Sequence, residues 1–83
     1  MTTHITESTI HNAFRLILAE KENKALNYCV AYARAGLDLT GHELYIQCLY
    51  VLNNMTQWRG AAAKEVRQTL KTFIKQEKRQ HER

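Results

Sequence analysis

The sequence predicts an all-α fold, a compact bundle of four helices, or of three if the first two are continuous. It contains no proline and only 3 glycines in 83 residues, so few positions interrupt a helix. Apolar residues recur at helical spacing in four stretches of the chain. With 45% hydrophobic and 24% charged residues, the chain has the balance of an ordinary folded domain. We therefore expect a single helical domain over residues 1–83, with frayed tails at about 1–7 and 76–83.

The first predicted helix follows Thr6 or Ser8. Either residue can cap it, because a hydroxyl oxygen accepts a hydrogen bond from an unpaired backbone N–H of the first turn. The apolar stripe of this helix consists of Ile10, Phe14, Ile17 and Leu18. The polar segment 20–24 is either a loop or the exposed elbow of one longer bent helix, and periodicity does not decide between the two.

The second predicted helix spans about residues 23–35 and has a face of small side chains. Ala25, Cys29 and Ala33 recur every four positions, which lets a neighbouring helix approach closely. Gly36 is expected to end this helix in the left-handed conformation, which other residues adopt only at a cost.

Residues 40–55 form the predicted central helix, the most apolar stretch of the chain. Thr40 and Glu43 have the spacing of a capping box, in which each side chain accepts a hydrogen bond from a backbone N–H at the helix start. The main apolar arc consists of Leu44, Tyr45, Cys48, Leu49, Val51, Leu52 and Met55. Ile46 and Tyr50 lie outside this arc. We therefore expect the helix either to contact three neighbours or to contribute to a second interface.

The fourth predicted helix begins between residues 56 and 60 and carries most of the positive charge. Its core seam consists of Ala62, Ala63, Val66, Leu70, Phe73 and Ile74. Residues 56–83 contain eight Lys or Arg against three Asp or Glu, whereas residues 1–55 contain four against five. Within an arc of about 80° on the helical wheel lie Lys64, Arg67, Lys71, Lys75 and Lys78. This row is either a solvated helix face or a surface that contacts phosphates.

Trp58, the only tryptophan, precedes Arg59 and Gly60 in the predicted connection between the third and fourth helices. It either closes the end of the bundle as a plug or forms a binding surface with Arg59, because tryptophan and arginine are enriched at interface hot spots. A helix-turn-helix that reads DNA with residues 40–54 is disfavoured. The polar strip of that helix is narrow and poor in side chains that recognise bases.

Several other functional classes lack their sequence patterns. Cys29 and Cys48 do not have the spacing of a zinc site, and no histidine pairs with a cysteine at a catalytic spacing on one helix. Neither a glycine-rich phosphate loop nor a pair of catalytic carboxylates is present. No apolar run is long enough to span a membrane, and the N-terminus lacks the order of a signal peptide. We expect a cytoplasmic protein that is not an enzyme, with no metal, no cofactor, no membrane partner and no small-molecule substrate.

The run LNYCVAYARAGLDLTGHELYIQCLYVLNNMTQWRG, residues 26–60, resembles small helical proteins carried by bacteria and their phages. The resemblance is one of general character rather than of a defined motif, and it implies no activity and no functional residue. It favours a small protein that acts by binding, such as a phage or mobile-element modulator of a host complex.

We therefore expect a non-enzymatic protein-binding module that binds a protein partner or itself as a homo-oligomer. The predicted protein interface consists of Ile46, Tyr50, Trp58 and Arg59. The rival expectation, from another class, is a nucleic-acid-binding accessory protein. In that case the phosphate-contacting residues are the five cations of the fourth helix.

Overall fold

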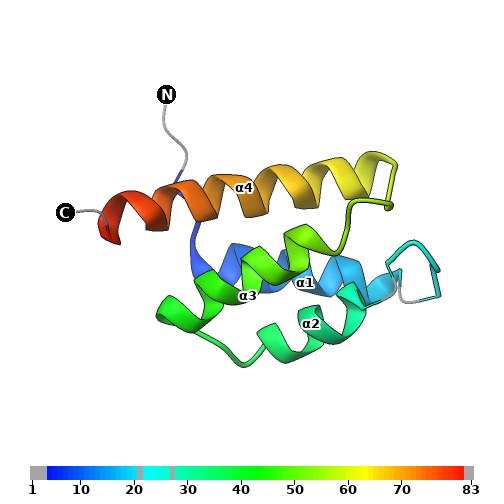
Figure 1. The fold of residues 1–83 in the computed structure, drawn as a ribbon, viewed down its shortest axis with the longest axis horizontal. Helices are drawn as coiled ribbons and strands as arrows, with labels where there is room; N and C mark the ends of the chain where they lie inside the picture. Colours follow the sequence, from blue (N-terminus) through cyan, green and yellow to red (C-terminus); the bar gives the residue numbers. More distant parts are fainter. Residues whose placement is uncertain (1–3, 21, 27, 82–83) are drawn as a thin grey trace.

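Four helices account for the regular structure of the residues that the computed structural model describes, which are 4–20, 22–26 and 28–81 (Figure 1). They are α1 (Glu7–Ala19), α2 (Cys29–Gly36), α3 (Gly41–Asn53) and α4 (Ala61–His81). Helices α1 and α3 each pack against both α2 and α4, so the helices surround one core with a radius of gyration of 12.1 Å. The predicted all-α fold is confirmed.

Helix α1 starts where the sequence predicts. Thr6 is the N-cap, and its hydroxyl oxygen accepts a hydrogen bond from the Thr9 N–H at 3.2 Å, which pairs one of the unpaired donors of the first turn. Three apolar side chains of the stripe, those of Ile10, Phe14 and Ile17, are fully buried. The helix therefore presents one apolar face to the core.

The segment between α1 and α2 is a series of turns, which excludes the bent-helix alternative. The backbone N–H of Asn23, Leu26 and Cys29 each donate to a carbonyl three residues earlier. The Asn23 side-chain oxygen also accepts a hydrogen bond from the Ala25 N–H at 2.9 Å. Such a local bond offers the backbone an alternative to the helix. Helix α2 consequently begins at Cys29, six positions later than predicted, and Asn27 lies outside the described residues.

Gly36 does not have the conformation that the sequence predicts. The glycines with a positive φ in the described part of the chain are Gly41, at 59°, and Gly60, at 115°. Gly36 is instead the last residue of α2 and lies buried against the ring of Phe14. A Cβ at this position would lie 2.7 Å from Phe14 Cδ2 and closer still to Cε2. Glycine is therefore required for close packing of α2 on α1.

The predicted capping box at the start of α3 is also wrong. Thr40 is the N-cap, but its side chain makes no capping hydrogen bond. Gly41, the first residue of the helix, has a left-handed φ of 59°, whereas a capping box continues directly into helical geometry. The carboxylate of Glu7 accepts a hydrogen bond from the Gly41 N–H at 2.6 Å. The first turn of α1 thus caps α3 across 34 positions of sequence.

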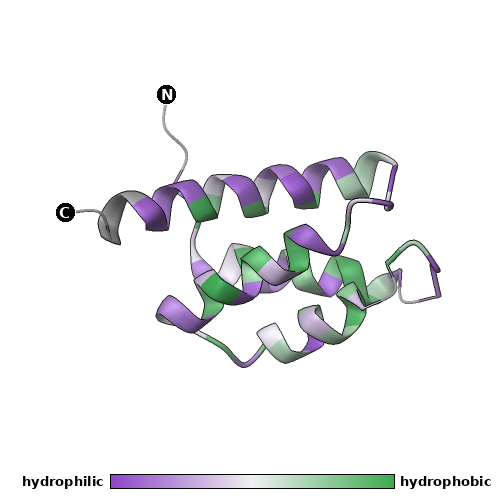
Figure 2. Cartoon of the chain, in the orientation of Figure 1, coloured by the Kyte–Doolittle hydropathy of each residue, from purple (hydrophilic) through white to green (hydrophobic). Residues whose placement is uncertain are grey.

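The core is drawn from every helix, and α4 is the most hydrophilic of the four along its length (Figure 2). Four residues of the predicted arc of α3 are buried, namely Leu44, Cys48, Val51 and Met55. Four residues of the predicted seam of α4 are buried as well, namely Ala63, Val66, Leu70 and Phe73. Ala62 is exposed, and Ile74 is half-buried. Helical periodicity therefore located the inner faces of both helices.

A side-chain clamp joins the beginning of the chain to the end of α4. Gln76 Oε1 accepts a hydrogen bond from the Ile5 N–H at 2.9 Å, and Gln76 Nε2 donates to the Ile5 carbonyl at 2.8 Å. Helix α4 continues to His81, beyond the last core residue, because Lys, Gln, Glu and Arg are good helix formers. Residues 1–3 and 82–83 of the predicted tails lie outside the described residues.

Gly36→Ala is expected to destabilise the fold, because the new methyl group collides with the Phe14 ring. Overpacking of this kind costs about 1–3 kcal/mol. Each kcal/mol lowers the melting temperature of a domain of this size by about 4–8 °C. Circular dichroism during heating measures the change. The matched control is Ala35→Leu, an enlargement at the neighbouring exposed position, which should change stability by less than about 0.5 kcal/mol. Equal melting temperatures for the two variants would contradict this role of Gly36.

Candidate functional site

The connection between α3 and α4 makes a tight corner at one end of the molecule (Figure 1). Met55 is fully buried in it, and Trp58 is only 2% exposed. The Trp58 N–H donates to the Met55 carbonyl at 3.1 Å, which closes a turn between the two buried side chains. Gly60 then adopts a φ of 115°, a conformation that favours glycine, immediately before α4 begins. The corner is thus anchored from inside.

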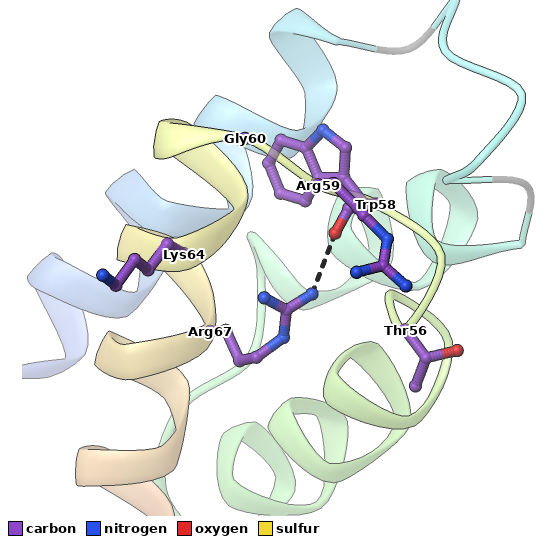
Figure 3. A pocket seen from close by; sticks show the side chains of 6 residues that line it. All are labelled: Thr56, Trp58, Arg59, Gly60, Lys64 and Arg67. Carbon is purple, nitrogen blue, oxygen red and sulfur yellow. Dashed lines mark hydrogen bonds between the residues drawn. The ribbon is translucent and has the colours of Figure 1, made fainter.

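Arg67, one and a half turns into α4, holds this connection from outside. Its Nη2 donates to the Trp58 carbonyl at 2.9 Å (Figure 3). The same Nη2 donates to the Met55 carbonyl at 3.1 Å. The side chain is half-buried. These bonds fix the guanidinium group in one place. The two carbonyls engage only Nη2, so the N–H groups of Nη1 and Nε make no bond to them.

A cavity of about 400 Å³ lies between the connection and the first turns of α4. Its described lining consists of Thr56, Trp58, Arg59, Gly60, Lys64 and Arg67 (Figure 3). Three of these residues are cations, and none is acidic. We call this cavity the corner pocket. Its charge makes it suited to an anion.

The corner pocket continues into the row of cations predicted from the sequence, here called the basic stripe (Lys64, Arg67, Lys71, Lys75 and Lys78). All but the half-buried Arg67 are exposed. At about 1.5 Å per residue, the stripe extends about 21 Å along α4. Lys64 and Arg67 belong to both features, so the corner pocket forms one end of the stripe.

The residues predicted as a protein interface separate into two places. Tyr50 is 49% exposed, and its ring stacks on that of Tyr32 in α2, with centroids 5.6 Å apart. Ile46, one turn earlier in α3, is half-buried. Trp58 and Arg59 lie at the corner, where Arg59 is exposed and Trp58 belongs to the core. Trp58 can therefore contribute to binding only indirectly, because it positions neighbouring residues such as Arg59.

Sequence reasoning did not find the corner pocket as a unit. It named Arg59 with the tryptophan and placed Lys64 and Arg67 in a separate row. The signal in the sequence is that Arg59 is followed by Lys64 five positions later and by Arg67 eight positions later, with a glycine directly after Arg59. Thr56 and the stacking partner Tyr32 carried no signal of their own.

The two cysteines are buried thiols. Burial raises the pKa of Cys29 to about 11. Burial, together with the negative charge of Glu77, raises the pKa of Cys48 to about 12. Both thiols are therefore protonated at neutral pH, whereas the thiolate is the nucleophilic form. Cys29 also donates from Sγ to the Val51 carbonyl at 3.6 Å.

In residues 4–20, 22–26 and 28–81, no group of three or more His, Cys, Asp or Glu residues has an arrangement suited to a metal ion. None of the helices in these ranges combines the length and the hydropathy of a membrane span.

Comparison with known proteins gave no matching family model, no matching curated protein and no matching solved structure. Functional inference for this chain therefore depends on its own surface chemistry.

Replacing Arg67 by methionine is expected to destabilise the protein by about 1–3 kcal/mol, the typical cost of a polar group left without its hydrogen-bond partner. The Trp58 carbonyl would lose the Arg67 donor, and the Met55 carbonyl would keep only the Trp58 N–H. Urea denaturation measures the loss. Lys64→Met, which removes a neighbouring exposed cation, is the control and should change stability by less than about 0.5 kcal/mol. An equal effect of both substitutions would show that the two carbonyl bonds are unimportant.

Proposed function

We propose that the protein is a non-enzymatic, nucleic-acid-binding accessory protein that contacts the phosphate backbone through the basic stripe of α4. The observation that carries this proposal is the alignment of the stripe on one helix, with four exposed cations and a half-buried fifth. Lysine and arginine along a helix face neutralise phosphates and release bound counterions, which supplies most of the non-specific affinity for nucleic acids.

The sequence alone ranks protein binding above nucleic-acid binding, and the positions of the side chains favour the reverse order. Trp58, half of the predicted hot spot, has its ring in the core. Ile46 is half-buried, which leaves Tyr50 as the exposed apolar residue of the predicted interface. All five cations of the rival prediction remain together on α4 and lead to the corner pocket. This contrast favours nucleic-acid binding over protein binding.

The chemistry of the stripe favours backbone contacts over base recognition. Lysine is a flexible point charge, and four of the five members are lysines. Sequence-specific readout requires side chains that match the hydrogen-bonding edges of bases, such as Asn, Gln or a bidentate Arg. We infer binding that is strongly dependent on salt and weakly dependent on sequence, by a cytoplasmic protein whose four helices pack as a bundle.

Binding of a labelled single strand and of a labelled duplex is expected to weaken steeply with salt. Five phosphate contacts correspond to a loss of about 500-fold in duplex affinity between about 50 and 200 mM salt. The variant with Lys71→Gln, Lys75→Gln and Lys78→Gln should bind less tightly. Its salt slope should fall by about 3, one for each removed contact. Fluorescence anisotropy at several salt concentrations measures both quantities.

The matched control removes three cations that lie away from α4, with Arg15→Gln, Lys24→Gln and Arg34→Gln. All three are exposed, and the change in net charge is the same as in the α4 variant. If the stripe is the contact surface, this control keeps most of the affinity and the salt slope. Equal loss in both variants, or no binding to either nucleic acid at low salt, would rule out the proposal.

A second candidate function, self-association, is favoured by one observation. The Tyr32–Tyr50 stack joins α2 to α3 at a place where Tyr50 remains half-exposed, and Tyr28 nearby in the chain is 68% exposed. Tyrosine is enriched in interface cores because it combines a large apolar ring with a polar tip. A homo-oligomer formed through this surface is compatible with nucleic-acid binding by α4.

Self-association is expected to be lost in Tyr50→Glu, because the charge would have to be buried in the interface. Sedimentation velocity over a wide range of protein concentrations measures the oligomeric state. Leu16→Glu introduces the same charge at another exposed apolar residue, on α1, and should leave the oligomer intact. A wild-type protein that is monomeric at every concentration would exclude this second function.

A further inference from the structure

The corner pocket brings together cations from two parts of the chain. Arg59 comes from the connection, whereas Lys64 and Arg67 come from the first two turns of α4 (Figure 3). The guanidinium groups of Arg59 and Arg67 lie on the same side of the connection, whereas the Lys64 side chain points away from them along α4 (Figure 3). Like charges repel, so neighbouring cations are unfavourable for the empty protein and favourable once an anion lies between them. This arrangement is not required by the core, because Arg59 and Lys64 are exposed.

Arg67 gives the corner pocket a fixed element. Its two hydrogen bonds to the Met55 and Trp58 carbonyls hold the guanidinium group before any ligand arrives. A ligand that binds a pre-positioned side chain does not have to supply the free energy of ordering it. Arg59 lies on the same side of the connection as the Arg67 guanidinium group, and the flexible Lys64 side chain reaches the ligand by rotating toward it (Figure 3). Trp58, which also lines the cavity, is held in the core.

We propose that the corner pocket is a binding site for a phosphate group. Arg59 can form paired hydrogen bonds with two phosphate oxygens, and Arg67, whose Nη2 is engaged by the two carbonyls, offers single N–H donors from Nη1 and Nε. Lys64 adds a flexible point charge. A phosphate presents enough oxygens for three separate cations, whereas a carboxylate presents two. The Thr56 hydroxyl is a further polar group in the lining, and the N-terminal end of α4 adds favourable potential to a site that the cations define.

The corner pocket has the volume of a small-molecule site. Pockets for small molecules measure about 300–1,000 Å³, and this one, at about 400 Å³, is near the lower limit. It is large enough for one phosphate with the sugar attached to it. Another cavity, of about 370 Å³ between α1 and α4, has Glu65 as the charged residue of its described lining. It has no convergent cations and carries no comparable inference.

This inference goes beyond the proposed function, because the corner pocket would bind a phosphate whether or not a strand lies along the basic stripe. The phosphate could belong to a free nucleotide or to the end of a nucleic-acid strand. Both sources present the same group to Arg59, Lys64 and Arg67, and separate ligands distinguish them.

The test uses the indole N–H of Trp58, which gives a single resonance because the chain has one tryptophan. Adenosine monophosphate is titrated into the full chain at low salt, with adenosine as the ligand that lacks the phosphate. We expect a saturable shift with the monophosphate and none with adenosine. The double variant Arg59→Gln and Lys64→Gln should bind the monophosphate at least about tenfold more weakly, since charge-assisted hydrogen bonds are lost.

The matched control is the double variant Lys71→Gln and Lys75→Gln, which removes the same charge from exposed positions outside the cavity. It should change affinity by less than about twofold. Wild-type protein that shows no saturable shift would overturn the proposal, as would equal weakening in both double variants or equal binding of adenosine. Circular dichroism of each variant verifies that it remains folded.

Oligonucleotides with a 5′-phosphate and with a 5′-hydroxyl identify the source of the group. Tighter binding of the phosphorylated strand, abolished in the Arg59 and Lys64 variant, supports a strand end as the ligand. Equal binding of the two strands, together with saturable binding of the monophosphate, supports a free nucleotide. Loss of strand binding in the α4 triple variant tests the proposed function alone, so either proposal can fail without the other.

Discussion

The hydrogen bonds from Arg67 to the carbonyls of Met55 and Trp58 are the interaction on which the surface of this protein depends. They join the middle of the second turn of α4 to the connection that precedes it, and so determine how the chain enters the helix. They attach the backbone that carries Arg59 to the helix that carries Lys64. One buried tryptophan and one half-buried arginine thus position a charged site in a chain with a small core.

The small core also explains why the exposed positive charge is concentrated on α4. A domain of this size buries only about 60% of the surface that its unfolded chain exposes, so the apolar faces of its helices are needed to form the core. Helices α1, α2 and α3 meet this requirement with short apolar faces, and α2 approaches α1 closely enough that Gly36 touches the Phe14 ring. Helix α4, with 21 residues, has the length to supply four core residues and still present a continuous charged face.

Sequence reasoning succeeded where the relevant physics is local. Apolar periodicity located the buried faces of α1, α3 and α4, and Thr6, one of the two candidate caps, is the N-cap of α1. It failed where the role of a residue depends on a partner that is distant in the sequence. Gly36 is a glycine because of a phenylalanine 22 positions earlier, and the N-terminus of α3 is capped from α1 rather than by its own box. The corner pocket was missed for a different reason. Lys64 and Arg67 are one turn apart on α4 and were predicted together, but the position of Arg59 beside them depends on the conformation of Gly60, with its φ of 115°.

The clamp between Ile5 and Gln76 has a practical consequence for how this molecule is handled. It brings the two ends of the described chain together at one pole, while the connection between α3 and α4 lies at the other (Figure 1). A dye, an affinity tag or a fusion partner joined near Ile5 or near the end of α4 is therefore joined at the pole opposite the corner pocket. Surface immobilisation at that pole leaves the corner pocket facing the solution, where a ligand in flow can reach it.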